Sequence, residues 1–146
     1  MRDLTAREVE ILEDVSNNFT WTSDADQFGK REAWYIMREK PYMGDCEDFA
    51  LTVLYNIKGR SVFKMLMSMT FLQGKVHYCT APNGVLHNTL RYKGWYTDNW
   101  EYKWCTKQDY IEKGYKFHPL WYWSWTAMWK LVAGYFIRRR KEKQNG

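Results

Sequence analysis

The sequence has little of what small secreted domains and metal-binding modules depend on. It has only three cysteines, which cannot all pair, and their spacing matches neither a disulfide framework nor a zinc motif. It contains no internal repeat and no low-complexity linker. The first ten residues include no apolar run, so no signal peptide is visible. We therefore expect a reducing compartment, the cytoplasm.

Aromatic residues, by contrast, are unusually frequent. They make up 18% of the 146 residues and include nine tryptophans and eleven tyrosines. So much ring area rarely hides completely in the single domain that a chain of this length predicts. We expect an aromatic core together with an exposed aromatic surface.

Residues 44–50, Gly-Asp-Cys-Glu-Asp-Phe-Ala, predict the start of an amphipathic helix. Asp45 is a typical N-cap with Asp48 three residues on, apolar residues follow at helical spacing, and Gly59 is a stop signal. Cys46 therefore lies in the first turn. Unpaired backbone N–H groups and the positive end of the helix dipole favour the thiolate there, so we expect a lowered pKa and a nucleophilic sulfur.

Two strand-like segments, 87–92 and 95–100, flank Lys93-Gly94 and predict a β-hairpin. The expected opposite pairs are Tyr92 with Trp95, Thr89 with Asp98, and His87 with Trp100. This register places His87 and Asp98 on one face as diagonal neighbours, with Cα atoms roughly 7–8 Å apart. At that separation a carboxylate can orient an imidazole.

Cys46, His87 and Asp98 thus form a candidate triad of nucleophile, base and orienting group. Alternatives stay open at each position. Cys46 also suits a small buried residue at a helix start, and Asp98 an ordinary carboxylate at a strand end. His77, in the strand-like segment 76–79, is the rival base. The remaining thiols, Cys79 and Cys105, lack comparable surroundings and are expected to be structural or free thiols. His118, which precedes a proline, is expected to be a surface or hinge residue.

These residues resemble the bacterial transglutaminase-like cysteine peptidases, a branch of the papain-like and transglutaminase-like superfamily. Members carry a Gly-Asp-Cys-Glu-Asp-Tyr/Phe-Ala block on a helix, a histidine that opens a strand, and Asp-Asn at the end of the next, here Asp98-Asn99. The likeness covers about residues 5–105, including the aromatic, strand-like stretch 18–21. It implies an α+β fold in which the nucleophile helix packs on an antiparallel sheet. The spacing from Cys46 to His87, the tight hairpin turn and the missing export signal depart from the pattern and leave substrate and compartment open. Small members without an export signal suit a bacteriophage or a cytoplasmic effector, so the resemblance implies the cytoplasm or, for a phage-encoded chain, the host cytoplasm or the virion.

The acidic residues beside Cys46 have two interpretations. In periplasmic relatives the matching residues bind calcium, so the resemblance implies a calcium site at Asp45 and Glu47, and more weakly at Asp48. Helix capping and compensation of the helix dipole explain the same residues without a metal. Two or three carboxylates are too few for a calcium cage without further oxygen ligands. The chemistry itself requires no cofactor.

Outside this region the pattern predicts helices first and strands after. Residues 5–16 form a helix with a Thr5/Glu8 capping box, and residues 30–39 form a second helix that ends before a proline. Alternating apolar residues over 62–72 predict a strand. This order of elements is typical of an α+β protein.

All of the net charge lies at the C-terminus. Residues 1–119 hold 16 basic and 16 acidic residues, whereas residues 120–146 hold 6 basic and 1 acidic. We therefore divide the chain into a transglutaminase-like domain, 1–119, and an aromatic, basic tail, 120–146.

The segment from Leu120 to Lys141 predicts contact with a membrane surface or a virion partner. Its apolar part is at the lower edge of a membrane span, but Lys130 would cost roughly 2.5–3.5 kcal/mol on insertion scales, which disfavours spanning. An interfacial helix fits better, because large apolar residues recur every three to four positions beside a basic cluster. These residues are Trp121, Trp125, Trp129, Val132 and Phe136. Packing on the domain or on a partner is the alternative, and we do not expect nucleic acid as a partner.

We expect a small cysteine peptidase that acts on a protein substrate. Cys46 attacks a carbonyl, His87 accepts and returns the proton, and Asp98 orients the imidazole. The backbone N–H of Cys46 contributes to an oxyanion hole. The same groups perform acyl transfer of the transglutaminase type when an amine replaces water. A non-catalytic virion or membrane-associated binding protein on the same scaffold is the competing hypothesis.

Overall fold

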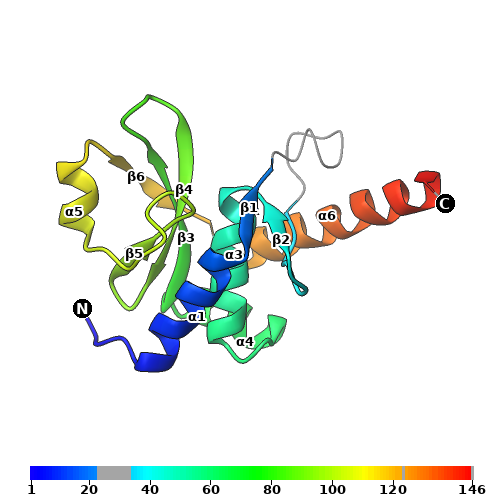
Figure 1. The fold of residues 1–146 in the computed structure, drawn as a ribbon, viewed down its shortest axis with the longest axis horizontal. Coiled ribbons are helices and arrows are strands. Elements are labelled where there is room, and N and C mark those ends of the chain that lie inside the picture. Colours follow the sequence, from blue (N-terminus) through cyan, green and yellow to red (C-terminus); the bar gives the residue numbers. More distant parts are fainter. Residues whose placement is uncertain (23–33, 123, 146) are drawn as a thin grey trace.

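The computed structural model describes residues 1–22, 34–122 and 124–145 and has a mixed α/β fold (Figure 1). The helices are α1 (Ala6–Asn17), α3 (Cys46–Ile57), α4 (Val62–Thr70), α5 (Lys107–Glu112) and α6 (Ser124–Asn145). The strands are β1 (Phe19–Trp21), β2 (Tyr42–Gly44), β3 (Gly74–Thr80), β4 (Leu86–Tyr92), β5 (Trp95–Thr97) and β6 (Lys116–Trp121). Four strands form an antiparallel sheet in the order β5-β4-β3-β6, and β1 pairs in parallel with β2. The predicted α+β class is confirmed.

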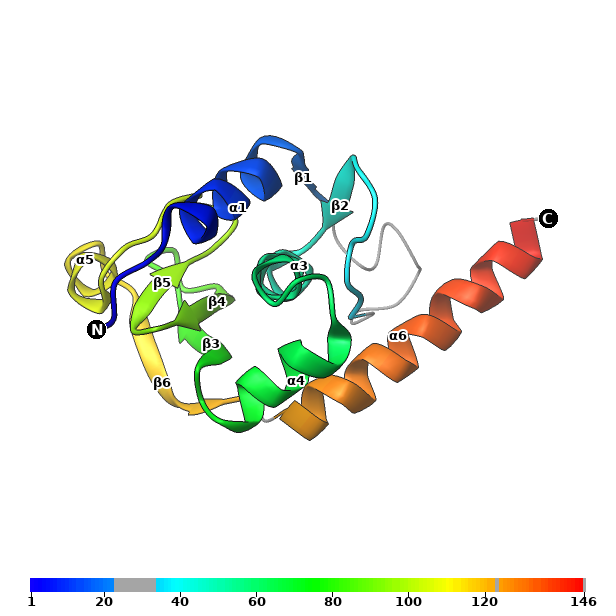
Figure 2. The same cartoon turned by 90° about the horizontal axis from the view of Figure 1, so that it is seen from below.

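Helix α3 lies at the centre of the molecule. Figure 2 views it almost end-on, with α1, the four-stranded sheet, α4 and the β1-β2 pair arranged around it. Every residue from Asp48 to Tyr55 is buried, as expected for a helix that packs on all sides. Leu12 and Val15 of α1 and Val76 and Leu90 of the sheet belong to the same core cluster. This core holds the first turn of α3 against β4.

Both predicted helix starts form capping boxes. In α1, Thr5 N donates to Glu8 Oε2 at 2.8 Å, and Glu8 N donates to Thr5 Oγ1 at 3.2 Å. In α3, Asp45 N donates to Asp48 Oδ2 and Asp48 N donates to Asp45 Oδ1, both at 3.3 Å. Helix α3 ends two residues before Gly59, whose φ of 71° suits glycine. Each reciprocal pair satisfies backbone N–H groups that have no partner inside the helix.

The β4-β5 hairpin forms around the predicted turn. Lys93 and Gly94 have φ values of 53° and 92°, as in the tight turns that match the twist of paired strands. The register pairs are Tyr92 with Trp95, Arg91 with Tyr96, and Leu90 with Thr97. Strand β5 ends there, so the two pairs predicted beyond it do not form, and Asp98 begins a turn instead.

The strand predicted over 62–72 is wrong, because Val62–Thr70 form helix α4. The run is apolar at nearly every position, so it satisfies a helical period as well as an alternating one. Met65 and Met69 are buried four residues apart, whereas Phe63 is 73% exposed. Ser61 caps the helix by accepting a hydrogen bond from Lys64 N. Burial on one helical face decides between the two patterns.

The helix predicted over 30–39 does not form in its described part, 34–39, which is irregular; the rest lies outside the described residues. Backbone N–H groups in this segment bond to side chains of α3 instead of to their own preceding carbonyls. Tyr35 N donates to Asp48 Oδ1 and Met37 N donates to Thr52 Oγ1, both at 3.0 Å. These tertiary hydrogen bonds compete with the helical ones, and Trp34 is buried beside them.

One face of α6 packs on the body of the protein. A Cβ atom placed on Gly134 would lie 1.9 Å from the Trp34 carbonyl oxygen, so α6 touches the backbone there. The Lys130 ammonium lies 5.0 Å from the Trp34 ring, and the Arg138 guanidinium lies 4.5 Å from the Tyr35 ring. The boundary predicted after residue 119 falls inside β6, so the four-stranded sheet extends into the predicted tail.

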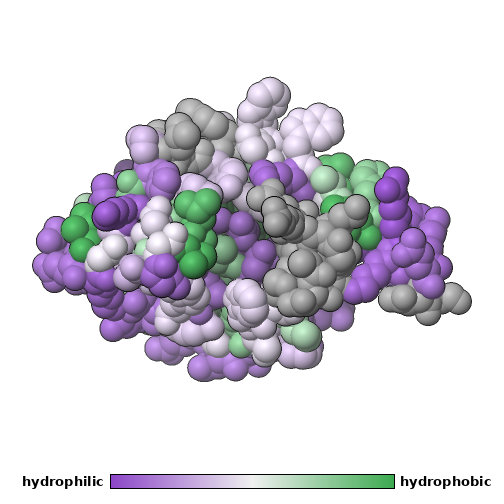
Figure 3. All heavy atoms as spheres, turned by 90° about the horizontal axis from the view of Figure 1, so that it is seen from above, coloured by the Kyte–Doolittle hydropathy of each residue, from purple (hydrophilic) through white to green (hydrophobic). Residues whose placement is uncertain are grey.

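The opposite face of α6 is open to solvent. Trp125, Trp129 and Phe136 are 67%, 63% and 54% exposed. Arg139 and Arg140 continue the exposed surface toward the C-terminus. Figure 3 shows the hydrophilic end of the molecule where α6 ends, with hydrophobic residues beside it. Within the described ranges, no helix has the length and apolar character needed to cross a bilayer.

Candidate active site

His87 and Asp98 form a buried hydrogen-bonded pair. Nε2 of His87 lies 2.9 Å from Oδ2 of Asp98, and the two side chains are 3% and 0% exposed. The other oxygen, Oδ1, accepts hydrogen bonds from the backbone N–H groups of Trp100 at 3.0 Å and Glu101 at 2.8 Å. An aspartate that bonds to the backbone two and three residues on is a common way to begin a turn. The turn after β5 therefore holds the Asp98 carboxylate in place, and this carboxylate orients the His87 imidazole.

Trp100 covers the imidazole of His87. The two rings are stacked, with centroids 4.3 Å apart and planes 17° from parallel. Tyr115 approaches the same imidazole with a centroid distance of 6.4 Å. These rings keep water away from the hydrogen bond between His87 and Asp98, and a hydrogen bond to a charged group gains strength in such an environment. Because Nε2 is held by Asp98, the second ring nitrogen is the one left for a nucleophile.

Cys46 lies against the next residue of the strand, Asn88. The thiol sulfur is 3.2 Å from Glu47 Oε2 and 3.9 Å from Asn88 Nδ2. Asn88 Nδ2 also donates to Glu47 Oε1 at 2.9 Å. Successive side chains of a strand point to opposite faces, so His87 lies on the face away from α3. Its cross-strand neighbour, Cys79, belongs to the cluster on that second face.

The structure therefore brings together two members of the predicted triad, His87 and Asp98, and holds Cys46 against the opposite face of the sheet. The contacts described for Cys46 include Glu47 and Asn88 but not His87, although both partners lie in the described part of the chain. Burial raises the pKa of the Cys46 thiol, and the backbone N–H of Asn88, which faces the sulfur, offsets only part of that rise. The thiol thus contacts Asn88, the neighbour of His87 in β4, while the His87–Asp98 pair lies on the other face of the strand.

The prediction that the helix start lowers the pKa of Cys46 is wrong. Burial raises the pKa of the thiol well above its ordinary value, and the negative charges of Glu47 and Asp45 raise it further. A helix start stabilises a thiolate by a modest amount, whereas removal from water and two nearby carboxylates act in the opposite direction. The thiol is held as a hydrogen-bond donor to Glu47.

Burial also raises the pKa of Glu47, to about 8, and the nearby Asp45 carboxyl contributes in the same direction. The Glu47 carboxyl can therefore gain or lose a proton near neutral pH while in contact with the thiol. Asn88 was not among the predicted site residues. Strand alternation offered a signal for it, since a hairpin with His87 on one face must present its neighbour to the other.

The rival base, His77, does not contact Cys46. Its Nε2 lies 2.7 Å from the backbone oxygen of His118, and its ring packs against Tyr96 and Phe117. Burial lowers the pKa of His77, and nearby cations lower it further. The remaining thiols, Cys79 and Cys105, are buried and unpaired, and burial raises the pKa of both.

The two carboxyl groups implied as calcium ligands lie near each other at the start of α3. Asp45 caps the helix, as the metal-free interpretation requires, and Glu47 bonds to Asn88 and Cys46. The raised pKa of Glu47 beside Asp45 means that a cation there would relieve repulsion between them. Two carboxylates supply fewer oxygens than calcium takes, and the described residues contain no group of three or more histidine, cysteine, aspartate or glutamate side chains that could hold a metal.

Models of known protein families and curated proteins were both compared with this chain, and none matches it. The likeness to transglutaminase-like cysteine peptidases therefore rests on the residues of this sequence.

Proposed function

We propose that this protein is a cysteine hydrolase of the transglutaminase-like kind, a small peptidase that cleaves amide bonds in proteins. The observation that carries the proposal is the buried hydrogen bond between His87 and Asp98, together with a cysteine in the first turn of the central helix that contacts Asn88, the next residue of β4. Nucleophilic acyl transfer uses a histidine that is oriented by a carboxylate and in contact with a thiol. The proposal therefore requires His87 and Cys46 to come together on one face of β4.

The arrangement of elements also supports a papain-like or transglutaminase-like fold. The nucleophile helix, α3, packs on the antiparallel sheet within the main core. The histidine follows on β4, and the aspartate follows at the end of β5. This order of nucleophile, base and orienting group is the one that the superfamily resemblance implies.

His87 lies on the face of β4 away from α3, so the proposed reaction requires the start of β4 to change its orientation. The Cys46 thiol then leaves Glu47 and meets the second ring nitrogen, Nδ1, of His87. Nδ1 accepts the thiol proton while Asp98 holds Nε2, and the thiolate sulfur adds to the substrate carbonyl carbon. The C–N bond then breaks, and the imidazolium returns its proton to the departing amine. Water, deprotonated by His87, cleaves the thioester and regenerates the thiol. The backbone N–H of Cys46 is our candidate donor to the oxyanion.

Incubation with a complex peptide mixture, followed by mass spectrometry of new termini, tests this function. We expect cleavage by the wild type, none by Cys46→Ala, and cleavage by Cys105→Ala, which removes another buried thiol. A thioester on Cys46, trapped by acid quenching, would support the same mechanism. Equal cleavage by the wild type and Cys46→Ala would contradict it. Addition of a primary amine distinguishes the alternative chemistry, since a transglutaminase yields an amide in place of the acid.

The base is tested by comparing three variants. We expect His87→Ala to lose activity, since Nδ1 is the proton acceptor, and His77→Ala to retain it, since Nε2 of His77 is bound to the backbone oxygen of His118. If Glu47→Gln loses activity while His87→Ala retains it, Glu47 is the base and the triad assignment is wrong. The activity of Asp98→Asn should lie between those of His87→Ala and His77→Ala, because the amide disturbs the orientation of the imidazole.

A second candidate function is docking to an anionic membrane surface through α6, with or without catalysis. The observation that favours it is the exposed face on which Trp125, Trp129 and Phe136 lead into Arg139 and Arg140. Tryptophan partitions to the headgroup region, and basic side chains are attracted to anionic lipids. A virion protein with an acidic, apolar surface is the competing partner. Either partner is compatible with the cytoplasmic or virion location that we expect.

A further inference from the structure

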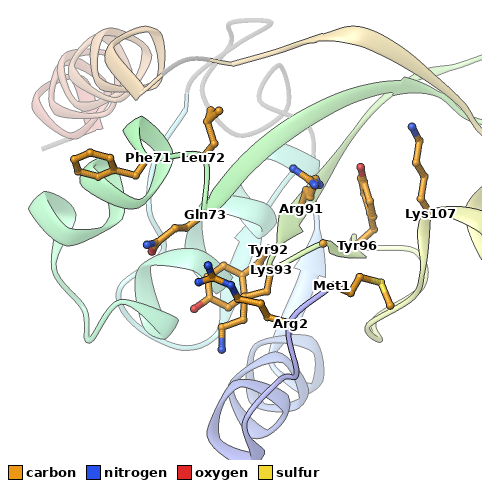
Figure 4. A pocket seen from close by; sticks show the side chains of 11 residues that line it. Met1, Arg2, Phe71, Leu72, Gln73, Arg91, Tyr92, Lys93, Tyr96 and Lys107 are labelled. Carbon is orange, nitrogen blue, oxygen red and sulfur yellow. The ribbon is translucent and has the colours of Figure 1, made fainter.

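A cavity of about 620 Å³ lies at the end of the sheet where β4 turns into β5. Figure 4 shows Arg91 of β4, Tyr96 of β5 and Lys107 of α5 extending in the same direction along its wall. Phe71 and Leu72, between α4 and β3, form the opposite side. Sites for small molecules typically enclose a few hundred to about a thousand Å³, so the size suits a compact ligand.

The charged side chains that line the cavity are all positive. Arg2, Arg91, Lys93 and Lys107 all line the cavity, and none of the lining residues that the structure describes is acidic. Lys93 is compensated by an ion pair with Glu8 at 2.9 Å. Arg2, Arg91 and Lys107 make no ion pair with any residue in the described ranges. Three positive side chains therefore share the cavity without a compensating carboxylate.

The sheet adds a further positive charge beside them. Lys75 of β3 is the direct cross-strand partner of Arg91. Like charges at directly opposite positions destabilise a pair of strands. Burial lowers the pKa of Lys75, and the charges of Arg91 and Lys107 lower it further. A bound anion would offset this crowding of positive charge.

The chemistry of the wall indicates the class of anion. A guanidinium presents a planar fork of donors that matches phosphate oxygens, and an ammonium adds a compact charge. Three uncompensated cations suit an anion with more than one negative charge better than a single carboxylate. The apolar side chains of Phe71 and Leu72 offer a surface for an organic group.

We propose that this cavity binds a small phosphate-bearing molecule, with its phosphate oxygens at Arg91 and Lys107 and its organic part against Phe71 and Leu72. The site is distinct from the candidate active site and does not depend on the proposed peptidase function. On β4, Arg91 lies four residues beyond His87.

Calorimetric titration of the full chain with pyrophosphate and with ADP tests the site. We expect both to bind, with Arg91→Gln and Lys107→Gln each weakening binding by about tenfold, the effect of losing one charged hydrogen bond. Arg140→Gln removes the same charge from the exposed end of α6 and should leave binding unchanged. Because Arg91→Gln also relieves repulsion with Lys75, its melting temperature should equal or exceed that of the wild type. ADP should bind more tightly than pyrophosphate, because only ADP has an organic part.

Four outcomes would overturn the proposal. If Arg140→Gln weakened anion binding as much as Arg91→Gln does, binding would depend only on the net charge of the protein and not on this cavity. Binding of succinate as tightly as pyrophosphate would contradict a preference for phosphate. Equal affinities for ADP and pyrophosphate would remove the assigned contact with Phe71 and Leu72. Binding of a single-stranded oligonucleotide without any binding of pyrophosphate or ADP would identify the cavity as part of a nucleic-acid surface.

Discussion

The Cys46 thiol donates a hydrogen bond to the carboxyl oxygen Oε2 of its neighbour Glu47 at 3.2 Å. Asn88 donates to the other oxygen of the same carboxyl group, so Glu47 joins the central helix to β4 at the candidate active site. Burial raises the pKa of both the thiol and the carboxyl group. The protonation of Glu47 is therefore coupled to the reactivity of Cys46.

Glu47→Gln should make the Cys46 thiol easier to ionise. Above about pH 8 the wild-type carboxylate opposes formation of the thiolate, and the amide removes that charge while keeping a similar shape. We expect the apparent pKa for alkylation of Cys46 by iodoacetamide, followed by mass spectrometry, to fall by about one unit or more. Glu13→Gln, on the exposed side of α1, is the matched control. An unchanged pH profile would show that Glu47 does not govern the thiol.

The stability of the fold should depend on pH through Glu47. The folded-state pKa of about 8 is above the unfolded value of 4.5, so folding favours the protonated form. The associated stability is full below about pH 4.5 and is lost as pH rises through about 8. Urea unfolding should show the wild type losing about 1 kcal/mol or more relative to Glu47→Gln over that range.

Asp45→Asn provides a check on this pH dependence. Asparagine is also a good N-cap, so the helix start is kept while the neighbouring charge is removed. The unfolding free energy of this variant should fall less steeply with rising pH than that of the wild type, because the Asp45 charge contributes to the raised pKa of Glu47. Parallel curves for the wild type and Glu47→Gln would contradict the raised pKa.

Calcium binding at Asp45 and Glu47 should release a proton. Glu47 is largely protonated at pH 7, and a carboxyl group must ionise to act as a ligand for the cation. Calorimetry in two buffers with different ionisation enthalpies should count up to about one proton released per calcium bound. Glu47→Gln should abolish the release. A titration to millimolar calcium without binding would leave Asp45 and Glu47 as capping and bridging groups only.

Gly134→Ala should weaken the attachment of α6. In an exposed helix this change stabilises by about 1 kcal/mol, because glycine has a low helix propensity. Here the added Cβ would lie 1.9 Å from the Trp34 carbonyl oxygen, so the helix or the segment beneath it must move. We expect a net loss of about 1–3 kcal/mol in unfolding free energy, measured with urea. Ala133→Ser, at the exposed neighbouring position, is the control. A stabilised Gly134→Ala variant would mean that α6 does not pack there.

The exposed face of α6 should bind vesicles that contain anionic lipid. We expect the full chain to co-sediment with phosphatidylserine-containing vesicles and not with purely zwitterionic ones. Replacement of Arg139 and Arg140 by glutamine should weaken binding about fivefold per charge, and Trp129→Ser should weaken it further. Arg7→Gln with Lys103→Gln removes two exposed charges elsewhere and should have little effect. Equal sedimentation of all variants would end the membrane hypothesis.

Much of the local structure could be predicted because it depends on residues a few positions apart. The capping boxes at Thr5 and Asp45 and the turn at Lys93-Gly94 follow from short-range backbone chemistry. The strand predicted over 62–72 failed because an apolar run satisfies two periods at once. The helix predicted over 30–39 failed in its described part because its N–H groups bond to α3 instead.

The sequence by itself determined that Cys46 begins a helix and that a tight hairpin brings His87 close to Asp98, whereas burial of that helix on all sides appears only in the structure. Only the tertiary structure decided that Asn88 meets the thiol and that burial with two acids raises the pKa of Cys46. The first features depend on hydrogen bonds and periodicity along the local chain. The others depend on how α3 and β4 pack, which removes water from the thiol and brings together charges and donors that lie far apart in the sequence.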